Sequence, residues 1–180
     1  MTQPEEEFQR AEPGGAMSGS EMAIAAEQDL FALIQGEASP AVAYGPATAA
    51  SRGEARLSRI RALLEIGGRP DRSYPVVHIA GTSGKGSVST FVDAICREAG
   101  IASGLHTTPS LQTPLEKLIS RGRMATPREF RELVDWVLGL QGELKALEPA
   151  HKARYGSSWV ALTLEYFRRV GVDLAILEAG

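Results

Sequence analysis

A glycine-rich loop between a β-prone run and an amphipathic helix constrains the fold of this chain more than any other feature. Residues 75–80 form a nearly continuous β-prone run, as expected of a strand that is buried on both faces. After the loop at residues 81–87, apolar residues recur at helical spacing on one face: Val88, Phe91, Val92, Ile95 and Ala99. Residues 101–107 predict a second strand. The segment is therefore a strand–loop–helix–strand unit, which implies a parallel sheet with a right-handed crossover.

The loop at residues 81–87 has the features of a phosphate-binding loop. Its glycines let the backbone reach positive φ and approach phosphates closely, and the helix that follows adds the partial positive charge of its N-terminus. Lys85 would bridge the β- and γ-phosphates, and Ser87 would place a hydroxyl on Mg²⁺. The strict P-loop pattern is not met, because Ile79 replaces the first glycine and Gly86 follows the lysine. The alternative is an ordinary glycine-rich turn with an exposed lysine, but the order of strand, loop, lysine, hydroxyl and helix favours phosphate binding.

The chain before this unit predicts two helices joined by a linker. Residues 1–20 are rich in Glu, Gly, Pro and Ser and are expected to be disordered. Residues 21–34 show a weak helical pattern, with Met22, Leu30, Phe31 and Ile34 as its apolar members. Residues 38–51 indicate a linker. The next helix has its apolar residues at helical spacing and ends at Gly67-Gly68: Leu57, Ile60, Leu63 and Leu64.

The chain after this unit predicts a loop, two helices and a third strand. Residues 108–125 show no sustained period and indicate a long loop, which in a compact domain usually has a function. Thr126, Pro127 and Glu129 then form the start of a helix with a capping box. Residues 158–170 predict another helix, and residues 172–178 a buried strand that ends in Glu178. The fold class is α/β, with a mostly parallel sheet flanked by helices.

Composition excludes several classes of protein. The 180 residues have a net charge of -3, which gives no general electrostatic reason to bind nucleic acid or an anionic membrane. No apolar run approaches the roughly 20 residues that span a bilayer, and Glu5, Glu6 and Glu7 do not suit a secretory signal. The single cysteine, Cys96, forms no intrachain disulfide and suits a reducing compartment, so a cytoplasmic protein is expected.

Four blocks in the second part of the chain resemble folylpolyglutamate and dihydrofolate synthases, which belong to the Mur ligase superfamily. Residues 78–87 resemble the family segment H-x-A-G-T-N-G-K-G-S, with Ser83 in place of Asn. Residues 107–111 are similar to T-S-P-H-L and residues 174–180 to L-A-V-L-E-V-G, and residues 59–64 also match. The resemblance implies that residues 52–180 are the N-terminal part of a truncated Mur ligase ATP-binding (central) domain. The disordered or weakly helical N-terminal segment and linker then correspond to residues 1–51.

The resemblance also implies an activity and a set of site residues. Enzymes of this family use ATP to phosphorylate a carboxylate of folate or dihydropteroate, and the amine of glutamate attacks the acyl phosphate. Lys85 would be catalytic, and the whole loop would bind the triphosphate: Gly81, Thr82, Ser83, Gly84, Lys85, Gly86 and Ser87. Ser87, Thr108 and Glu178 would hold Mg²⁺, and Pro109, Ser110 and Lys117 would meet the substrate. A solvated acid at the end of its strand is the alternative for Glu178, and both roles stay open for Thr108.

Departures from the family pattern leave the substrate open. Gly156 and Ser157 stand where the family has Phe-Glu, Ser110 replaces a His, and Lys117 replaces an Arg in the loop associated with the pterin. ATP and Mg²⁺ binding survive these changes, but a Mur-type ligase for another carboxylate is an alternative. Because the family continues beyond the position of Gly180, we hypothesise an inactive fragment, whose missing C-terminal portion could come from a separate chain. The chain could also be a nucleotide-binding module without ligase activity, or a remnant without a function of its own.

Overall fold

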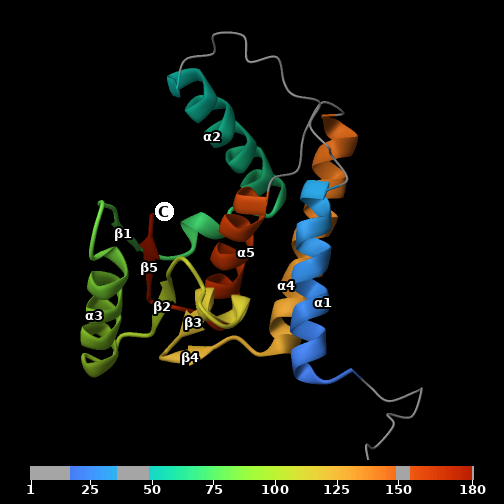
Figure 1. Cartoon of the computed structure of the whole chain (residues 1–180). Helices are drawn as coiled ribbons and strands as arrows, with labels where there is room; N and C mark the ends of the chain where they lie inside the picture. The colour runs from blue at the N-terminus through green and yellow to red at the C-terminus, as the bar shows by residue number, and fades with distance from the viewer. Residues whose placement is uncertain (1–16, 36–48, 149–154, 180) are drawn as a thin grey trace, which may run out of the picture.

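A computed structural model describes residues 17–35, 49–148 and 155–179 of the chain (Figure 1). In chain order its elements are α1 (Gly19–Gln35), α2 (Ala49–Ile66), η1 (Pro70–Arg72), β1 (Val76–Ile79), α3 (Lys85–Glu98), β2 (Ser103–His106), η2 (Pro114–Lys117), β3 (Ile119–Ser120), β4 (Arg123–Met124), α4 (Pro127–Leu147), α5 (Tyr155–Val170) and β5 (Leu174–Glu178). Disorder was expected for residues 1–20, of which residues 1–16 lie outside the described residues, whereas residues 19–20 begin α1 and contradict the expectation. The linker was expected over residues 38–51, of which residues 38–48 lie outside the described residues, whereas residues 49–51 begin α2 instead.

The described strands form one sheet in the order β1-β5-β2-β3-β4. β1, β5 and β2 run parallel, whereas the short strand β3 pairs antiparallel with β2, and β4 pairs antiparallel with β3. The sheet lies between α3 and α5 in Figure 1. The predicted α/β class with a mostly parallel sheet is therefore confirmed, and β1 and β2 are joined through α3 as expected of a crossover unit.

The expected long loop at residues 108–125 contains regular structure, so that part of the prediction was wrong. It includes the 3-10 helix η2 and the hairpin of β3 and β4, and Ala125 N donates to Leu118 O at 2.8 Å. Arg121, with φ of 50°, and Gly122, with φ of 74°, form the turn between the two strands. Strands of two residues are too short to produce a period of two, so sequence periodicity could not predict them.

α1 packs against α4 and α5. Its buried residues are Ala23, Ala26 and Leu30, and Arg131 of α4 bonds Asp29 at 2.6 Å. The predicted helix is confirmed, and two small alanines are buried in it together with Leu30. Phe31 is exposed at its edge and stacks on Tyr155 with ring centroids 4.6 Å apart. The division of the chain near residue 52 remains a prediction.

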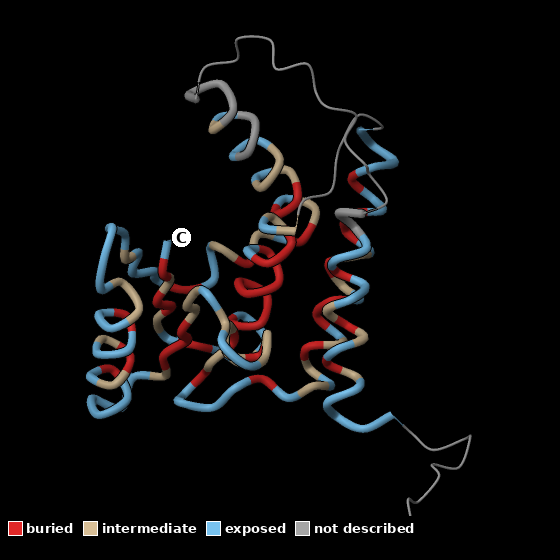
Figure 2. Tube along the Cα trace, in the orientation of Figure 1, coloured by how far each residue is buried: buried red, intermediate tan, exposed pale blue. Residues whose placement is uncertain are grey.

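The main hydrophobic core lies between α1, α2, α4 and α5, where buried residues follow the facing sides of the helices (Figure 2). α4 begins with the predicted capping box, because Thr126 Oγ1 accepts from Glu129 N at 3.2 Å and Glu129 Oε2 accepts from Thr126 N at 2.7 Å. Phe130 then stacks on Trp159 with ring centroids 5.5 Å apart. The core thus fixes α5, which precedes the strand that ends in Glu178.

α3 turns a polar side toward the sheet, contrary to the sequence prediction. Its buried residues are Ser89, Asp93 and Cys96, and Asp93 accepts from Ser103 Oγ at 2.6 Å and from Arg97 at 3.0 Å. This buried carboxylate must keep its hydrogen bonds, so it sets the rotation of the helix. The predicted apolar face is largely exposed as a result, and β1 is not buried on both faces as expected.

Candidate phosphate-binding site

The loop between β1 and α3 has an open, glycine-dependent backbone. Gly84 is the N-cap of α3 with φ of 75°, and Gly81 has φ of 153°, both in the region that favours glycine. The loop residues from Gly81 to Gly84 are exposed. Within the described part of the chain, the amides of Thr82 and Ser83 find no acceptor, and the first-turn amides of α3 are unpaired by helix geometry. The loop therefore presents several free N–H groups at the positive end of a helix.

Glu178 brings the end of β5 against this loop. It is 8% exposed and pairs in register with Ile79, the last residue of β1. Its Oε1 lies 4.0 Å from Lys85 Nζ, and its Oε2 accepts from Thr108 N at 2.9 Å. A Cβ added at Gly86 would lie 3.7 Å from Oε2, so Gly86 lets the helix pass close to the carboxylate. Three segments far apart in sequence thus meet at one end of the sheet, where parallel strands place their carboxyl ends.

The hydroxyl of Ser87, in the first turn of α3, is not used in a hydrogen bond within the helix. Ser89 Oγ donates to Lys85 O at 2.9 Å and Thr90 Oγ1 to Gly86 O at 2.9 Å, so both hydroxyls are used within the helix. Ser87 is exposed and hydrogen-bonds to none of the described residues. It is therefore free to meet a ligand or a metal at the loop.

The donor set at this end of the sheet fits a Mg²⁺ ion that is held together with phosphates. Among the residues described, no group of three or more His, Cys, Asp or Glu side chains could hold a metal by itself. Mg²⁺ in nucleotide sites is usually bound through one or two carboxylates together with substrate phosphates and water. Glu178 provides one carboxylate and Ser87 one hydroxyl, whereas Thr108 reaches Glu178 through its backbone amide.

The residues expected to meet the substrate are not all brought to this site. Pro109 is the next residue in the chain after Thr108, whose amide donates to Glu178. Lys117 instead places its Nζ 4.3 Å from the ring centroid of Trp159 and 5.6 Å from that of Tyr155. Burial lowers the pKa of Lys117. The structure places Lys117 against aromatic rings, and Ser110 makes no hydrogen bond within the described residues.

His106 is a residue to which the sequence assigned no role and which the structure connects to the same loop. Its Nδ1 lies 3.0 Å from Lys117 O and 3.0 Å from Thr163 Oγ1. A carbonyl oxygen only accepts, so Nδ1 carries the proton. Burial lowers the pKa of His106. The neutral ring of His106 therefore holds η2 against the end of β2. The position of His106 at the end of a predicted strand was the signal in the sequence that could have indicated this role.

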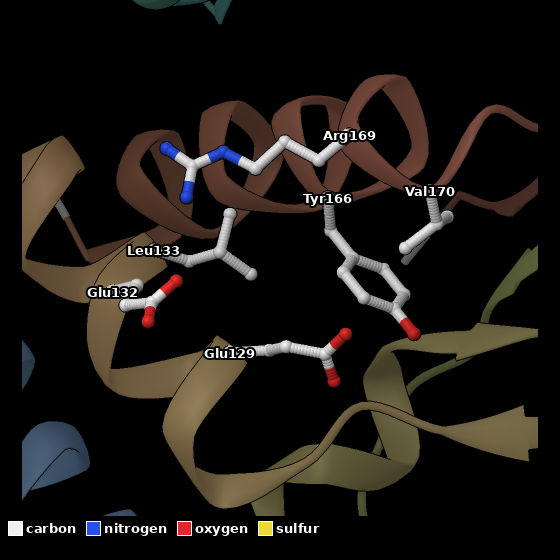
Figure 3. A pocket seen from close by; sticks show the side chains of 6 residues that line it. All are labelled: Glu129, Glu132, Leu133, Tyr166, Arg169 and Val170. Atoms are coloured by element: carbon white, nitrogen blue, oxygen red, sulfur yellow. The ribbon is translucent and has the colours of Figure 1, made fainter.

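A small hollow between α4 and α5 is not a candidate for this site. It has a volume of about 40 Å³, far below the ~300 Å³ of ordinary ligand pockets. Figure 3 shows the side chains that line it: Glu129, Glu132, Leu133, Tyr166, Arg169 and Val170. It includes none of the residues expected to bind nucleotide, metal or substrate.

Comparison with known proteins supports the assignment by sequence. No protein-family model matches the chain. A dihydrofolate synthase/folylpolyglutamate synthase of Mycobacterium tuberculosis is 35% identical over 131 residues, which is 69% of this chain and 27% of the relative. The dihydrofolate synthetase of Saccharomyces cerevisiae is 30% identical over 130 residues, covering 71% of this chain and 29% of the relative.

Solved structures agree with the sequence relatives. Folylpolyglutamate synthase of Mycobacterium tuberculosis complexed with ADP matches with a TM-score of 0.71 at 29% identity, over 88% of this chain and 33% of that one. The enzyme from Thermotoga maritima matches with a TM-score of 0.69 at 26% identity, over 87% and 33% of the two chains.

No helix in the described residues is long and apolar enough to cross a membrane. The chain spans less than a third of the length of the two sequence relatives, at 27% and 29%. Over the matched residues, the motifs, the sequence identity and the fold all indicate the same family. The chain is therefore similar, in sequence and in fold, to part of the folylpolyglutamate/dihydrofolate synthases, the family of ATP-dependent ligases that its motifs indicated.

Proposed function

We propose that this chain is the nucleotide-binding part of an ATP- and Mg²⁺-dependent ligase that adds glutamate to a carboxylate of folate or dihydropteroate. The observation that carries the proposal is the meeting of Glu178, Lys85 and the Thr108 amide beside an exposed glycine-rich loop. Relatives that share this fold are folylpolyglutamate synthases, one of them complexed with ADP. ATP would supply the phosphoryl group that converts the acceptor carboxylate to an acyl phosphate.

The residues of the chain divide the task of holding the nucleotide. The free amides of Thr82 and Ser83 and the N-terminus of α3 would bind phosphate oxygens. Lys85 would neutralise the β- and γ-phosphates as a point charge. Glu178 and Ser87 would bind Mg²⁺, and the hydrogen bond from the Thr108 amide would hold the Glu178 carboxylate in place. This arrangement positions the transferred group, which is the main contribution of proteins to phosphoryl transfer.

Most of the length of the relatives has no counterpart among the matched residues of this chain, and we propose that ligation requires that part. Because the chain spans 27% of the Mycobacterium tuberculosis relative, we propose that the 180 residues alone do not join glutamate to a folate. The one cysteine, Cys96, is buried and unpaired, which suits the reducing cytoplasm that we include in the proposal.

A nucleotide-binding module without ligase activity is the second candidate. One observation favours it: Lys117, expected to meet the substrate, lies over Trp159 at 4.3 Å. In the segment after β2, the Thr108 amide therefore still donates to Glu178, whereas the charged group of Lys117 packs against an aromatic ring. The same observation also agrees with a Mur-type ligase that takes another carboxylate. The three candidates are separated by measuring acyl-phosphate formation with different carboxylates in the presence of the rest of the enzyme. A module without ligase activity should form none, whereas each kind of ligase should form it with its own carboxylate.

The test is a calorimetric titration of the chain with Mg·ATP. A charge-assisted hydrogen bond contributes about 1.5–3 kcal/mol, so Lys85→Ala should weaken nucleotide binding by roughly 10- to 150-fold. Lys145→Ala removes an exposed lysine from α4 and serves as the matched control. Both variants should unfold at nearly the same denaturant concentration as the parent. Equal affinity of the parent and Lys85→Ala would refute the phosphate-binding role of the loop.

A further inference from the structure

Asp93 is a buried carboxylate on α3 that lies outside the candidate phosphate-binding site. It is 3% exposed. Its Oδ1 accepts from Ser103 Oγ at 2.6 Å, and its Oδ2 accepts from Arg97 Nε at 3.0 Å. A buried carboxylate is costly unless it is paired and hydrogen-bonded, so both oxygens have to keep their partners. The position of Asp93 is therefore restricted by Ser103 and Arg97 together.

Ser103, the partner of Asp93, is itself fixed within the sheet. It is fully buried and pairs in register with β5. Its carbonyl oxygen accepts from Arg121 N at 2.9 Å, so the strand is also held on its other side. Arg97 packs on the turn between β3 and β4, because a Cβ added at Gly122 would lie 3.1 Å from Arg97 Nη1. Asp93 thus ties α3 both to β2 and to this turn.

The apolar contacts of α3 are few and do not fix its rotation by themselves. The sheet separates α3 from the main core, which lies among the other helices (Figure 1). Within the described part of the chain, Cys96 and the half-buried Val92 are the residues of α3 that join the small apolar cluster beneath it. Apolar contact has no preferred direction, whereas a hydrogen bond does. The hydrogen bonds of Asp93 therefore set the angle at which the helix lies on the sheet.

The rotation that Asp93 sets is carried along the helix to Lys85. Lys85, Ser89 and Asp93 follow one another at spacings of four residues and so lie along one face of α3. Eight residues of helix separate Lys85 from Asp93 by about 12 Å along the axis. A rotation of about 20° would move a side-chain tip that lies about 5.5 Å from the axis by roughly 2 Å. Such a movement would displace Lys85 Nζ, which lies 4.0 Å from Glu178 Oε1, from its place beside the loop.

We propose that Asp93 is a positioning residue for the nucleotide. Through Ser103 and Arg97 it holds α3 at the rotation that directs Lys85 and the first-turn amides at the phosphates. This inference rests on the proposed function. Charge-assisted hydrogen bonds to phosphate depend on distance and direction, so a small rotation of the helix weakens several of them together. A substitution about 12 Å from Lys85 along the helix should therefore change the affinity for nucleotide.

The experiment is a calorimetric titration of the full 180-residue chain and its variants with Mg·ATP. Asp93→Ala should weaken binding by roughly tenfold, because Lys85 remains but is displaced. Asp93→Asn keeps an oxygen that accepts from Ser103 Oγ, so it should bind within about threefold of the parent. The matched control is Glu165→Ala, which removes from α5 a carboxylate that is also 3% exposed and is paired with Arg169 at 2.8 Å. Both alanine variants should lose stability, but Glu165→Ala should bind Mg·ATP as the parent does.

The single cysteine of the chain gives a second readout that needs no nucleotide. Cys96 is 7% exposed and lies about one turn after Asp93, on the face of α3 that packs against the sheet. If Asp93 holds this face in place, a thiol reagent should label Cys96 faster in Asp93→Ala than in the parent under native conditions. Glu165→Ala should be labelled at the rate of the parent.

The outcomes separate the positioning role from the proposed function. Failure of the parent to bind Mg·ATP would refute the proposed function and, with it, the inference. A parent that binds Mg·ATP while Asp93→Ala binds it equally well would refute the inference alone. Equal loss of affinity in Asp93→Ala and Glu165→Ala would also overturn it, because general destabilisation would then explain the effect. Equal labelling of Cys96 in the parent and Asp93→Ala would show that Asp93 does not set the rotation of α3.

Discussion

Replacing Gly104 with alanine tests how closely β2 packs against α5. Gly104 lies in the centre of β2, paired with Ala175 of β5 on one side and Ser120 of β3 on the other. A Cβ at this position would lie 2.6 Å from Cδ1 and 2.8 Å from Cε1 of Phe167. Favourable carbon contacts are about 3.5–4.0 Å, so the methyl group would overlap the ring by roughly 1 Å. Phe167 is fully buried, and the close packing of protein interiors opposes movement of its ring.

The size of the effect follows from two opposing terms. Overpacking of a well-filled core costs about 1–3 kcal/mol. Alanine is favoured over glycine in a strand by roughly 0.5–1 kcal/mol, because glycine loses more backbone entropy on folding. An overlap of about 1 Å places the cost of overpacking in the upper half of its range, about 2–3 kcal/mol. The free energy of unfolding should therefore fall by a net ~1–2.5 kcal/mol, equivalent to a melting temperature lower by roughly 2–10 °C for a chain of this length.

Equilibrium unfolding in urea measures this difference through the shift of the midpoint. Gly139→Ala is the matched control: position 139 lies within α4 with nothing within 4 Å of an added Cβ, so alanine should stabilise the helix by roughly 0.5–1 kcal/mol. In the background of Phe167→Leu, which removes part of the ring, Gly104→Ala should cost less. A Gly104→Ala protein as stable as the parent would refute the close packing of β2 on α5.

Two further predictions concern the cap of α4 and the buried histidine. Thr126→Ala should lower the free energy of unfolding by about 1 kcal/mol, since it removes the acceptor of Glu129 N; an unchanged urea midpoint would contradict the role of the cap. Burial lowers the pKa of His106 in the folded state, so the unfolded state binds more protons as the pH falls below the unfolded pKa of about 6.5. The free energy of unfolding should therefore decrease on acidification from pH 7 toward the lower folded pKa. His106→Asn should reduce this dependence, with His78→Asn as the histidine control, and an unaltered pH profile of His106→Asn would argue against a buried neutral ring.

Local chemistry explains what could be predicted about the fold. The capping box at Thr126 and Glu129 forms between residues three apart, so the sequence contains both partners. Gly84 and Gly81 occupy backbone conformations that favour glycine, so the loop could be recognised from its glycines. The resemblance to the family implied a metal-binding role for Glu178, and the structure puts its carboxylate 4.0 Å from Lys85, at the end of the sheet where parallel strands place their carboxyl ends.

Distant residues decided what local patterns did not reveal. The apolar residues of α3 follow one helical face, but the hydrogen bond between Asp93 and Ser103 turns another side of the helix to the sheet. The substrate role of Lys117 stays a prediction, and the structure places its side chain over Trp159, which lies 42 positions further along the chain. Neither partner is visible in a local sequence pattern.

The sequence by itself determined the strand–loop–helix unit, the capped start of α4 and the glycine-rich loop, since these depend on backbone preferences and on neighbours within a few positions. Only the tertiary structure decided the position of β1 at the edge of the described sheet, the face that α3 exposes and the aromatic surroundings of Lys117. These features depend on which segments meet in space. A buried charge or an unpaired edge acquires its surroundings only when the elements pack together.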